Sequence, residues 1–227
     1  GAVVNSTITL GGDRLFFMES RSDAVMALDA GRAGDEISKD RFLVSMDAQN
    51  GGALWDRPYG EDKATFVMYL MYTDERLIAV DSSDRWELSA FGTSDGQLLW
   101  EQNYEWLRDH HGGAMTHPAI IGDMIIAEPK IVSLSSGEVL RDVPDRNHGC
   151  GTLAASRDTI LWRDGNHGMW NVETDERTVW NDFRPGCWLG LISANGLLLA
   201  PETSAGCWCA SQPLQTSVAF AKADAAR

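Results

Sequence analysis

The sequence has few basic residues and no long hydrophobic run. Its 227 residues include 19 Lys and Arg against 33 Asp and Glu, so the formal net charge is −14. Nucleic acids and anionic membranes are bound through clustered Lys and Arg, and this deficit argues against both as partners. No apolar stretch approaches the roughly 18 to 20 residues that a membrane helix needs. We therefore expect a chain that does not span a membrane and has a self-repelling, acidic surface.

The sequence also lacks an opening signal segment and an initiator Met. It begins at Gly1, which suggests a processed or excised segment, so the missing signal does not define a compartment. Cysteine is scarce, and its four residues all lie late in the chain: Cys150, Cys187, Cys207 and Cys209. In an oxidising compartment such cysteines pair as disulfides, and in a reducing one they more often hold a metal.

Helical periodicity is absent over any long window, and no α-helix is predicted. An internal repeat is present instead. Phe42–Trp55 and Leu88–Trp100 each read as an apolar strand, a polar turn ending in Gly, and a second strand closing on Trp. Ile131–Leu140 keeps the turn but is followed by Arg141 in place of Trp, and Met169–Trp180 keeps Trp but has Glu176 in place of Gly.

The period of this repeat predicts an all-β fold. Turn positions 51, 96, 137 and 176 are separated by 45, 41 and 39 residues, the length of a four-stranded β-propeller blade. Further hairpin turns are expected at Gly122–Asp123, Arg157–Asp158 and Asn195–Gly196. We expect about five blades, as part of a larger propeller or as a smaller closed one, at residues 2–59, 65–104, 115–143, 150–182 and 187–220, followed by a frayed tail at 221–227. The fifth blade lacks an outer strand, which the chain's beginning or further sequence would have to supply.

These repeats resemble the pyrroloquinoline-quinone-like (PQQ-like) β-propeller superfamily, which includes quinoprotein alcohol dehydrogenases and the outer-membrane protein assembly lipoprotein. The second half is similar to bacterial envelope-type members that carry HHGG…HP, GCGT and RxGCW…NGL…CxC segments. Here these segments are His110–Pro118, Gly149–Thr152, Arg184–Trp188, Asn195–Leu197 and Cys207–Cys209. The resemblance implies a periplasmic or extracellular protein. Quinoprotein dehydrogenases have eight blades and a platform of two adjacent Cys, whereas Trp208 separates Cys207 from Cys209, so PQQ binding is not expected.

Propeller topology predicts that every His and Cys lies on one face. Links between blades and the second-to-third strand links within a blade emerge together, and these links carry all nine residues. The candidate binding face comprises His110, His111, His117, His148, His167, Trp188 and Trp208, together with the four Cys. We expect the Cys to be oxidised in pairs, with Cys187 bonded to Cys207 or Cys209 and the remaining partner bonded to Cys150, because Cys207 bonded to Cys209 would close a strained ring.

Two alternatives to disulfides stay open at this face. Thiolates and imidazoles suit zinc or copper, although the spacing matches no zinc-ribbon pattern. A Cys–His nucleophile is the weaker alternative, because no orienting third group is identifiable. Elsewhere, the repeated Trp55, Trp100 and Trp180 indicate packing between blades. Six Asp are expected to cap turns: Asp81, Asp84, Asp95, Asp123, Asp158 and Asp164.

The sequence thus favours a non-catalytic binding or scaffolding propeller of the bacterial envelope, whose link face would take a protein or a small-molecule ligand. The alternative is a redox or electron-transfer protein that holds a metal or a quinone at the same face. No catalytic residue and no resident cofactor is predicted.

Overall fold

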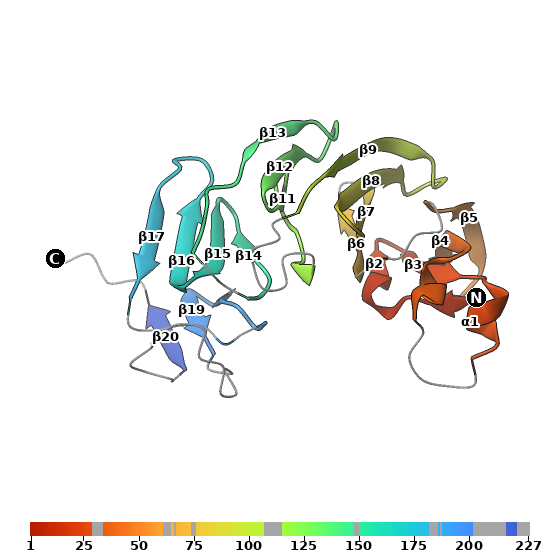
Figure 1. The fold of residues 1–227 in the computed structure, drawn as a ribbon, viewed down its shortest axis with the longest axis horizontal. Coiled ribbons are helices and arrows are strands. Elements are labelled where there is room, and N and C mark those ends of the chain that lie inside the picture. The colour runs from red at the N-terminus through yellow and green to blue at the C-terminus, as the bar shows by residue number, and fades with distance from the viewer. Residues whose placement is uncertain are drawn as a thin grey trace. The chain divides into compact units, whose positions relative to one another are not determined.

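The computed structural model describes residues 1–28, 34–60, 65, 67–73, 76–106, 115–147, 150–181, 186, 188–201 and 217–221. The regular secondary structure of these residues consists almost entirely of antiparallel strands (Figure 1). The helices that lie wholly within the described ranges are one short α-helix, α1 (Asp23–Met26), and two 3-10 turns, η1 (Asn5–Thr7) and η2 (Asp35–Ser38). The sequence did not predict α1, which has four residues and lies in the connection between two strands of the first sheet.

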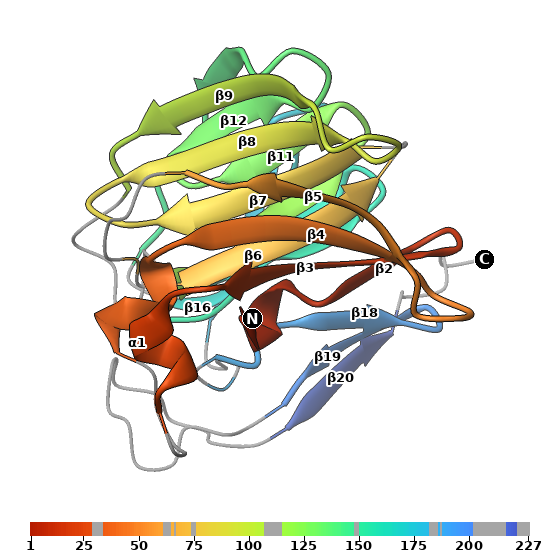
Figure 2. The same ribbon diagram turned by 90° about the vertical axis from the view of Figure 1, so that its right-hand side faces the viewer.

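The chain forms two compact units, and the first comprises Gly1–Glu105 with the turn Ser136–Glu138. In its first sheet, β1 and β2 pair with successive parts of β3, and β4 and an outermost β5 follow on the other side of β3. Figure 2 shows β2 to β5 in this order. Its second sheet has the order β6-β7-β8-β9. The strand bounds are β1 Ala2–Val3, β2 Thr9–Gly11, β3 Arg14–Ser20, β4 Arg41–Asp47, β5 Ala53–Pro58, β6 Val67–Thr73, β7 Arg76–Ser82, β8 Trp86–Gly92 and β9 Leu98–Tyr104.

The position of the first strand bears on the missing outer strand of the fifth blade. Ala2 pairs with Ser20 and Val3 with Glu19, so β1 completes the inner edge of the first sheet. The chain's beginning is therefore not the outer strand of the fifth blade in this structure.

The second unit comprises Trp106–Ser135 and Val139–Arg227. It contains two four-stranded sheets, β10-β11-β12-β13 and β14-β15-β16-β17, and a three-stranded sheet, β18-β19-β20. The strand bounds are β10 Ala119–Ile121, β11 Met124–Ala127, β12 Lys130–Ser133, β13 Val139–Asp142, β14 Ala154–Ser156, β15 Thr159–Asp164, β16 Asn166–Asn171, β17 Arg177–Trp180, β18 Ile192–Ala194, β19 Leu197–Ala200 and β20 Val218–Ala221. The first strands of successive sheets, β10, β14 and β18, lie next to one another.

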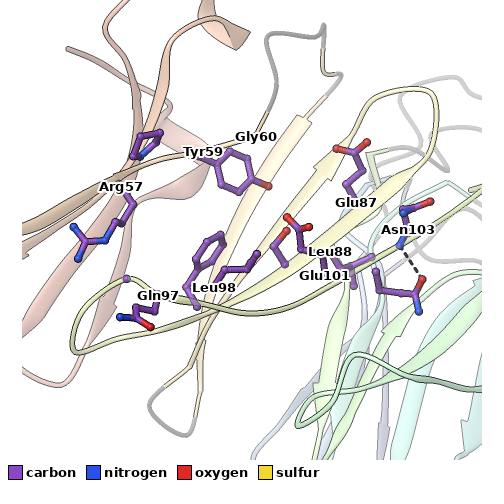
Figure 3. Close-up of a pocket in the computed structure, with 14 residues that line it drawn as sticks. Arg57, Tyr59, Gly60, Glu87, Leu88, Gln97, Leu98, Glu101 and Asn103 are labelled. Atoms are coloured by element: carbon purple, nitrogen blue, oxygen red, sulfur yellow. Dashed lines mark hydrogen bonds between the residues drawn. The ribbon is translucent and has the colours of Figure 1, made fainter.

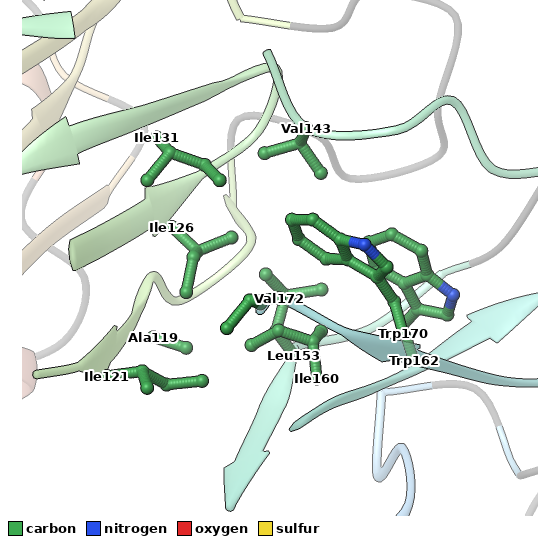
Figure 4. Packing of buried hydrophobic residues seen from close by; sticks show 10 residues of the cluster. All are labelled: Ala119, Ile121, Ile126, Ile131, Val143, Leu153, Ile160, Trp162, Trp170 and Val172. Atoms are coloured by element: carbon green, nitrogen blue, oxygen red, sulfur yellow. The ribbon is translucent and has the colours of Figure 1, made fainter. Parts of the chain in front are cut away.

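The core of the second unit lies between sheets. Ten buried side chains from the β10–β13 and β14–β17 sheets form one cluster, in which the rings of Trp162 and Trp170 stack with centroids 5.7 Å apart (Figure 4). Gly168 is required there, because a Cβ on it would lie 2.4 Å from Cδ1 of Trp162. Each large side chain in such a cluster contributes about 1.5–3 kcal/mol by burial, so the cluster joins the two sheets firmly.

The repeated turn has a left-handed residue at a fixed place. Gly51, Gly96 and Gly137 have φ of 72°, 68° and 77°, as the repeat predicts. In the fourth copy the left-handed residue is Asp175, with φ of 61°, and not Glu176. The prediction was off by one residue because a non-Gly residue occupies the turn, and Asp is one of the few side chains that tolerate this backbone conformation.

Each repeated Trp packs against the turn of the next sheet. Trp55 Nε1 donates a hydrogen bond of 3.0 Å to the carbonyl oxygen of Thr93, and its ring lies against Gly96. The ring of Trp100 lies against Gly137 in the same way. The expected packing role is therefore correct, although both rings are half-buried. Strands β5 and β9 do not end at Trp as predicted, since β5 continues to Pro58 and β9 to Tyr104, whereas β17 does end at Trp180.

The third and fourth copies vary this contact. Arg141, in the Trp position, bonds Asp175 Oδ1 at 3.0 Å, donates to the carbonyl oxygen of Val172, and lies over the Trp170 ring at 5.1 Å. Trp180 stacks on Phe220 of β20 with centroids 6.0 Å apart. The guanidinium of Arg141 thus makes the contact with the next sheet that a Trp indole makes in the first two copies.

Candidate binding face at the blade links

The structure describes four residues of the predicted face: His117, Cys150, His167 and Trp188. The others lie outside the described residues: His110, His111, His148, Trp208, Cys187, Cys207 and Cys209. Within the described ranges, no group of three or more His, Cys, Asp or Glu is placed to hold a metal ion. The predicted disulfides and the zinc or copper alternative thus both stay predictions.

Three links of the second unit converge in front of β10, β14 and β18. The backbone N–H of His117 donates to Thr152 Oγ1 at 3.1 Å. Gly151 faces the backbone of Trp188 so closely that a Cβ on it would lie 3.2 Å from Trp188 N, and a Cβ on Gly190 would lie 3.1 Å from the Thr152 carbonyl oxygen. These contacts join three loops that are far apart in sequence, as propeller topology predicted.

Trp188 is the most unusual residue of these links. Its φ is 71°, in the left-handed region, which costs roughly 1–2 kcal/mol for a residue with a Cβ. Its side chain is nevertheless 48% exposed, and the neighbouring Leu189 is 52% exposed. Met115, two residues before His117, is exposed as well. We call Met115, His117, Trp188 and Leu189 the link surface. Backbone strain that supports an exposed aromatic side chain is typical of binding positions.

His117 adds a polar group to the link surface. Its Nδ1 lies 2.7 Å from the carbonyl oxygen of Pro118, so Nδ1 donates the hydrogen bond. The neutral ring then carries its lone pair on Nε2, which can accept a hydrogen bond or bind a metal. The side chain is half-buried, and its orientation is set by its own backbone.

Cys150 and His167 are buried and do not belong to this surface. Cys150 is buried beside Gly151. His167 has no exposed surface and makes an edge-on contact with Phe220, with ring centroids 5.7 Å apart. His167 pairs with Trp180, which stacks on the same Phe220. Its contacts place it in the core between β16 and β20, so it does not join the link surface in this structure.

A concave site that was not predicted lies in the first unit. It is a pocket of about 570 Å³ between β5 and β8–β9 (Figure 3). Tyr59, Ser89 and Phe91 are buried in its floor, while Glu87 and Glu101 bring carboxylates to it. Strand alternation could have indicated it, because Glu87, Ser89 and Phe91 share one face of β8.

Much of this pocket's polar lining is engaged within the protein. Gln102 Nε2 donates to the carbonyl oxygen of Gly137 at 3.1 Å, and Gln102 Oε1 accepts from the Asn103 N–H at 2.9 Å. Asn103 Oδ1 accepts from Arg85 at 3.2 Å. Burial, assisted by the charge of Asp81, raises the pKa of Tyr59 well above its usual value, so this phenol is neutral at physiological pH. The pocket is polar, half-open and largely structural.

The predicted turn caps divide into two kinds. Asp95 Oδ1 accepts from the Gln97 N–H at 3.0 Å, and Asp123 accepts from Ser135 N–H at 2.8 Å, so both cap turns as expected. Asp81 does not. It lies in β7, fully buried, and bonds Arg41 of β4 at 2.6 Å. The sequence could not reveal this pairing, because the two residues belong to different sheets.

Comparisons with known proteins identify the fold. No family model matches the sequence, and no curated protein does. Among solved structures, BamB from Moraxella catarrhalis is similar at 13% identity and a TM-score of 0.57, over 96% of this chain and 61% of BamB. The RRP9 WD40 repeats are similar at 11% identity and a TM-score of 0.54, over 88% of this chain and 57% of that one. The Pan2 WD40 domain of Neurospora crassa is similar at 13% identity and a TM-score of 0.51, over 97% and 60%.

The chain therefore spans about six tenths of the length of these structures. It is all-β and has the β-propeller fold with four-stranded antiparallel blades, as the repeat predicted. None of the described helices has the length and apolar character needed to cross a membrane.

Proposed function

We propose that this chain is a non-catalytic binding or scaffolding propeller of the bacterial envelope and that the link surface contacts its partner. The observation that carries the proposal is Trp188, an exposed indole on a left-handed backbone beside the exposed Leu189. About half of this side chain stays exposed, so the fold gains only part of the packing energy that the indole could provide. A partner that covers Trp188 would supply that energy, because Trp is among the residues that most often dominate binding.

The surrounding structure supports a binding role. The link surface is supported by contacts among three links, which hold the backbone of these links in place before a partner arrives. Met115 and Leu189 extend the apolar area around Trp188, and His117 contributes a polar atom. The likeness to BamB and the PQQ-like repeats favour an envelope protein, with a protein or a small molecule as the partner.

The variant W188G separates a binding role from a packing role. Gly adopts the left-handed conformation without strain, so the free energy of unfolding should stay within about 1 kcal/mol of the wild type. A Trp that packed the fold would instead cost several kcal/mol on removal. Denaturant unfolding measures the difference, and a loss above about 2 kcal/mol would assign Trp188 to the core and contradict the proposal.

Site-specific photo-crosslinking then tests the surface directly. A photoreactive amino acid replaces Leu189 in one variant and Leu99 in the control, since both side chains are 52% exposed and Leu99 lies on β9 of the first unit. In cells that export the protein, we expect a discrete adduct from position 189 that W188G abolishes, and none from position 99. Equal adducts from both positions, or none from 189, would overturn the proposal. Stoichiometric zinc, copper or quinone in the purified protein would favour the redox alternative instead.

A further inference from the structure

The sequence contains two Asn-Gly pairs, and the structure places them in turns of different character. Asn50–Gly51 lies between β4 and β5, and Asn195–Gly196 lies between β18 and β19. All four residues are exposed. We propose that Asn195 is a site of spontaneous deamidation and that the fold protects Asn50 from the same reaction. This inference is independent of the proposed function.

The reaction needs only water. The backbone nitrogen of the Gly loses its proton and attacks Cγ of the preceding Asn, which forms a C–N bond and expels ammonia. The resulting succinimide is then opened by water at either carbonyl. One opening gives Asp, and the other gives isoaspartate, in which the chain continues through the side-chain carbon. The attacking nitrogen and the carboxamide must therefore both be free to approach each other.

Both reacting groups of Asn50–Gly51 are held by hydrogen bonds. The Gly51 N–H donates to the carbonyl oxygen of Asp47 at 2.9 Å, so the attacking nitrogen is engaged. Asn50 Oδ1 accepts from the Gly52 N–H at 2.7 Å, which holds the carboxamide over the following residue. The Asn50 N–H donates to Asp47 Oδ1 at 3.0 Å, so the whole turn is fixed around Asp47.

Asn195–Gly196 lacks these restraints. The two residues form a two-residue hairpin turn between paired Ala194 and Leu197, with φ of 50° and 74°. In such a turn the hydrogen bond closes between the flanking residues, so the central N–H is not used. Within the described residues, neither the Asn195 carboxamide nor the Gly196 N–H makes a hydrogen bond. A Cβ on Gly196 would meet nothing within 4 Å, so a succinimide ring and water have room.

The modification would change the hairpin chemically. Deamidation replaces a neutral amide with a carboxylate and adds one negative charge to a chain already at −14. Isoaspartate also inserts a methylene into the backbone of a two-residue turn, whose geometry sets the register of β18 against β19. The modified turn would therefore lie in the β18-β19-β20 sheet, which has only three strands in the described residues.

Peptide mapping by mass spectrometry, with isoaspartyl methyltransferase labelling, tests the inference on the full chain. During incubation of folded protein at mildly alkaline pH, deamidation at Asn195 should be roughly tenfold faster than at Asn50, the ratio expected from one or two hydrogen bonds. In denaturant the two sites should react at similar rates. Equal rates in the folded protein, or faster reaction at Asn50, would overturn the proposal.

Two variants check the mechanism. Asp47→Ala removes the carboxylate that fixes the turn, and deamidation at Asn50 should then accelerate while that at Asn195 stays unchanged. Asn195→Gln lengthens the side chain beyond easy ring closure, so the signal at residue 195 should vanish and that at Asn50 should not change. A persistent signal in the second variant would place the modification elsewhere and refute the assignment.

Discussion

At the residue scale, a matched pair of glycine variants tests the packing of Trp55 on the following turn. Gly51 and Gly96 have nearly the same left-handed φ, but a Cβ on Gly51 would meet nothing within 4 Å, whereas one on Gly96 would lie 2.6 Å from the Trp55 ring. G51A should therefore lower the free energy of unfolding only by the cost of a left-handed backbone at a residue with a Cβ, about 1 kcal/mol. G96A should cost a further 1–3 kcal/mol or so, because the indole must move. Denaturant midpoints measure both, and equal costs would show that Trp55 does not need this contact.

Asp175 makes a pH-dependent prediction at the same scale. Hydrogen bonds from Trp170 and then Arg141 lower the pKa of its carboxyl group below the usual 3.8. A carboxyl whose folded pKa is lowered contributes stability above its unfolded pKa, and that stability is lost as the pH falls through the folded pKa. The stability difference between wild type and D175N should therefore be constant above about pH 5 and shrink in more acid solution. Denaturant unfolding across pH checks it, and a difference that grows on acidification would contradict it.

At the element scale, one buried ion pair joins the two sheets of the first unit. Arg41 of β4 and Asp81 of β7 are each 1% exposed and 2.6 Å apart, and Thr65 also bonds Asp81. Removing one partner leaves the other charge buried, which costs about 3–5 kcal/mol. R41M and D81A should each strongly lower the free energy of unfolding. The double variant should lose much less free energy than the sum of the two single losses. Additive losses in this cycle would mean that the two side chains do not interact.

The strand ladders explain why the fourth blade departs from the repeat. In the first three repeats a bulge interrupts the outer ladder, between Ser45 and Met46, Ala90 and Phe91, and Ile131 and Val132. The β16–β17 ladder runs without one, so Thr178 faces Met169 and Trp180 faces His167. Alternation puts Thr178 and Trp180 on the same face. Trp180 thus points towards the next sheet, like Trp55 and Trp100. It lies two residues further along its outer strand, because Thr178 occupies the equivalent ladder position.

At the scale of the whole molecule, the state of the four cysteines decides between the two functional hypotheses. Cys150 precedes Gly151, which packs against the backbone of Trp188, whereas Cys187, Cys207 and Cys209 lie outside the described residues. We expect no reactive thiol in unfolded, unreduced protein. Two disulfides would each stabilise the fold by about 2–4 kcal/mol. Four reactive thiols accompanied by released metal would refute the disulfide prediction and favour the metal or redox protein.

Local signals in the sequence determined most of the architecture. Gly122–Asp123, Arg157–Asp158 and Asn195–Gly196 form hairpin turns as predicted, because residues that tolerate a left-handed backbone specify a turn without help from distant parts of the chain. The spacing of the Trp repeats likewise predicted four-stranded sheets. Predictions for the link face depended on which loops contact one another. The sequence indicated only which strands each loop connects, and not the contacts between loops.

Only the tertiary structure decided which residues pair across sheets. Asp81 looked like a turn cap and is a buried ion-pair partner of Arg41, 40 residues away; His167 looked like a surface ligand and lies in the core against Phe220. Trp188 looked like one more aromatic beside a Cys, and the structure places it on a left-handed backbone, close to Gly151, with about half of its surface exposed. The sequence by itself determined the strands and their turns, because these depend on neighbouring residues. The partners of charged and aromatic side chains depend on contacts between distant segments, which form only when the sheets pack together.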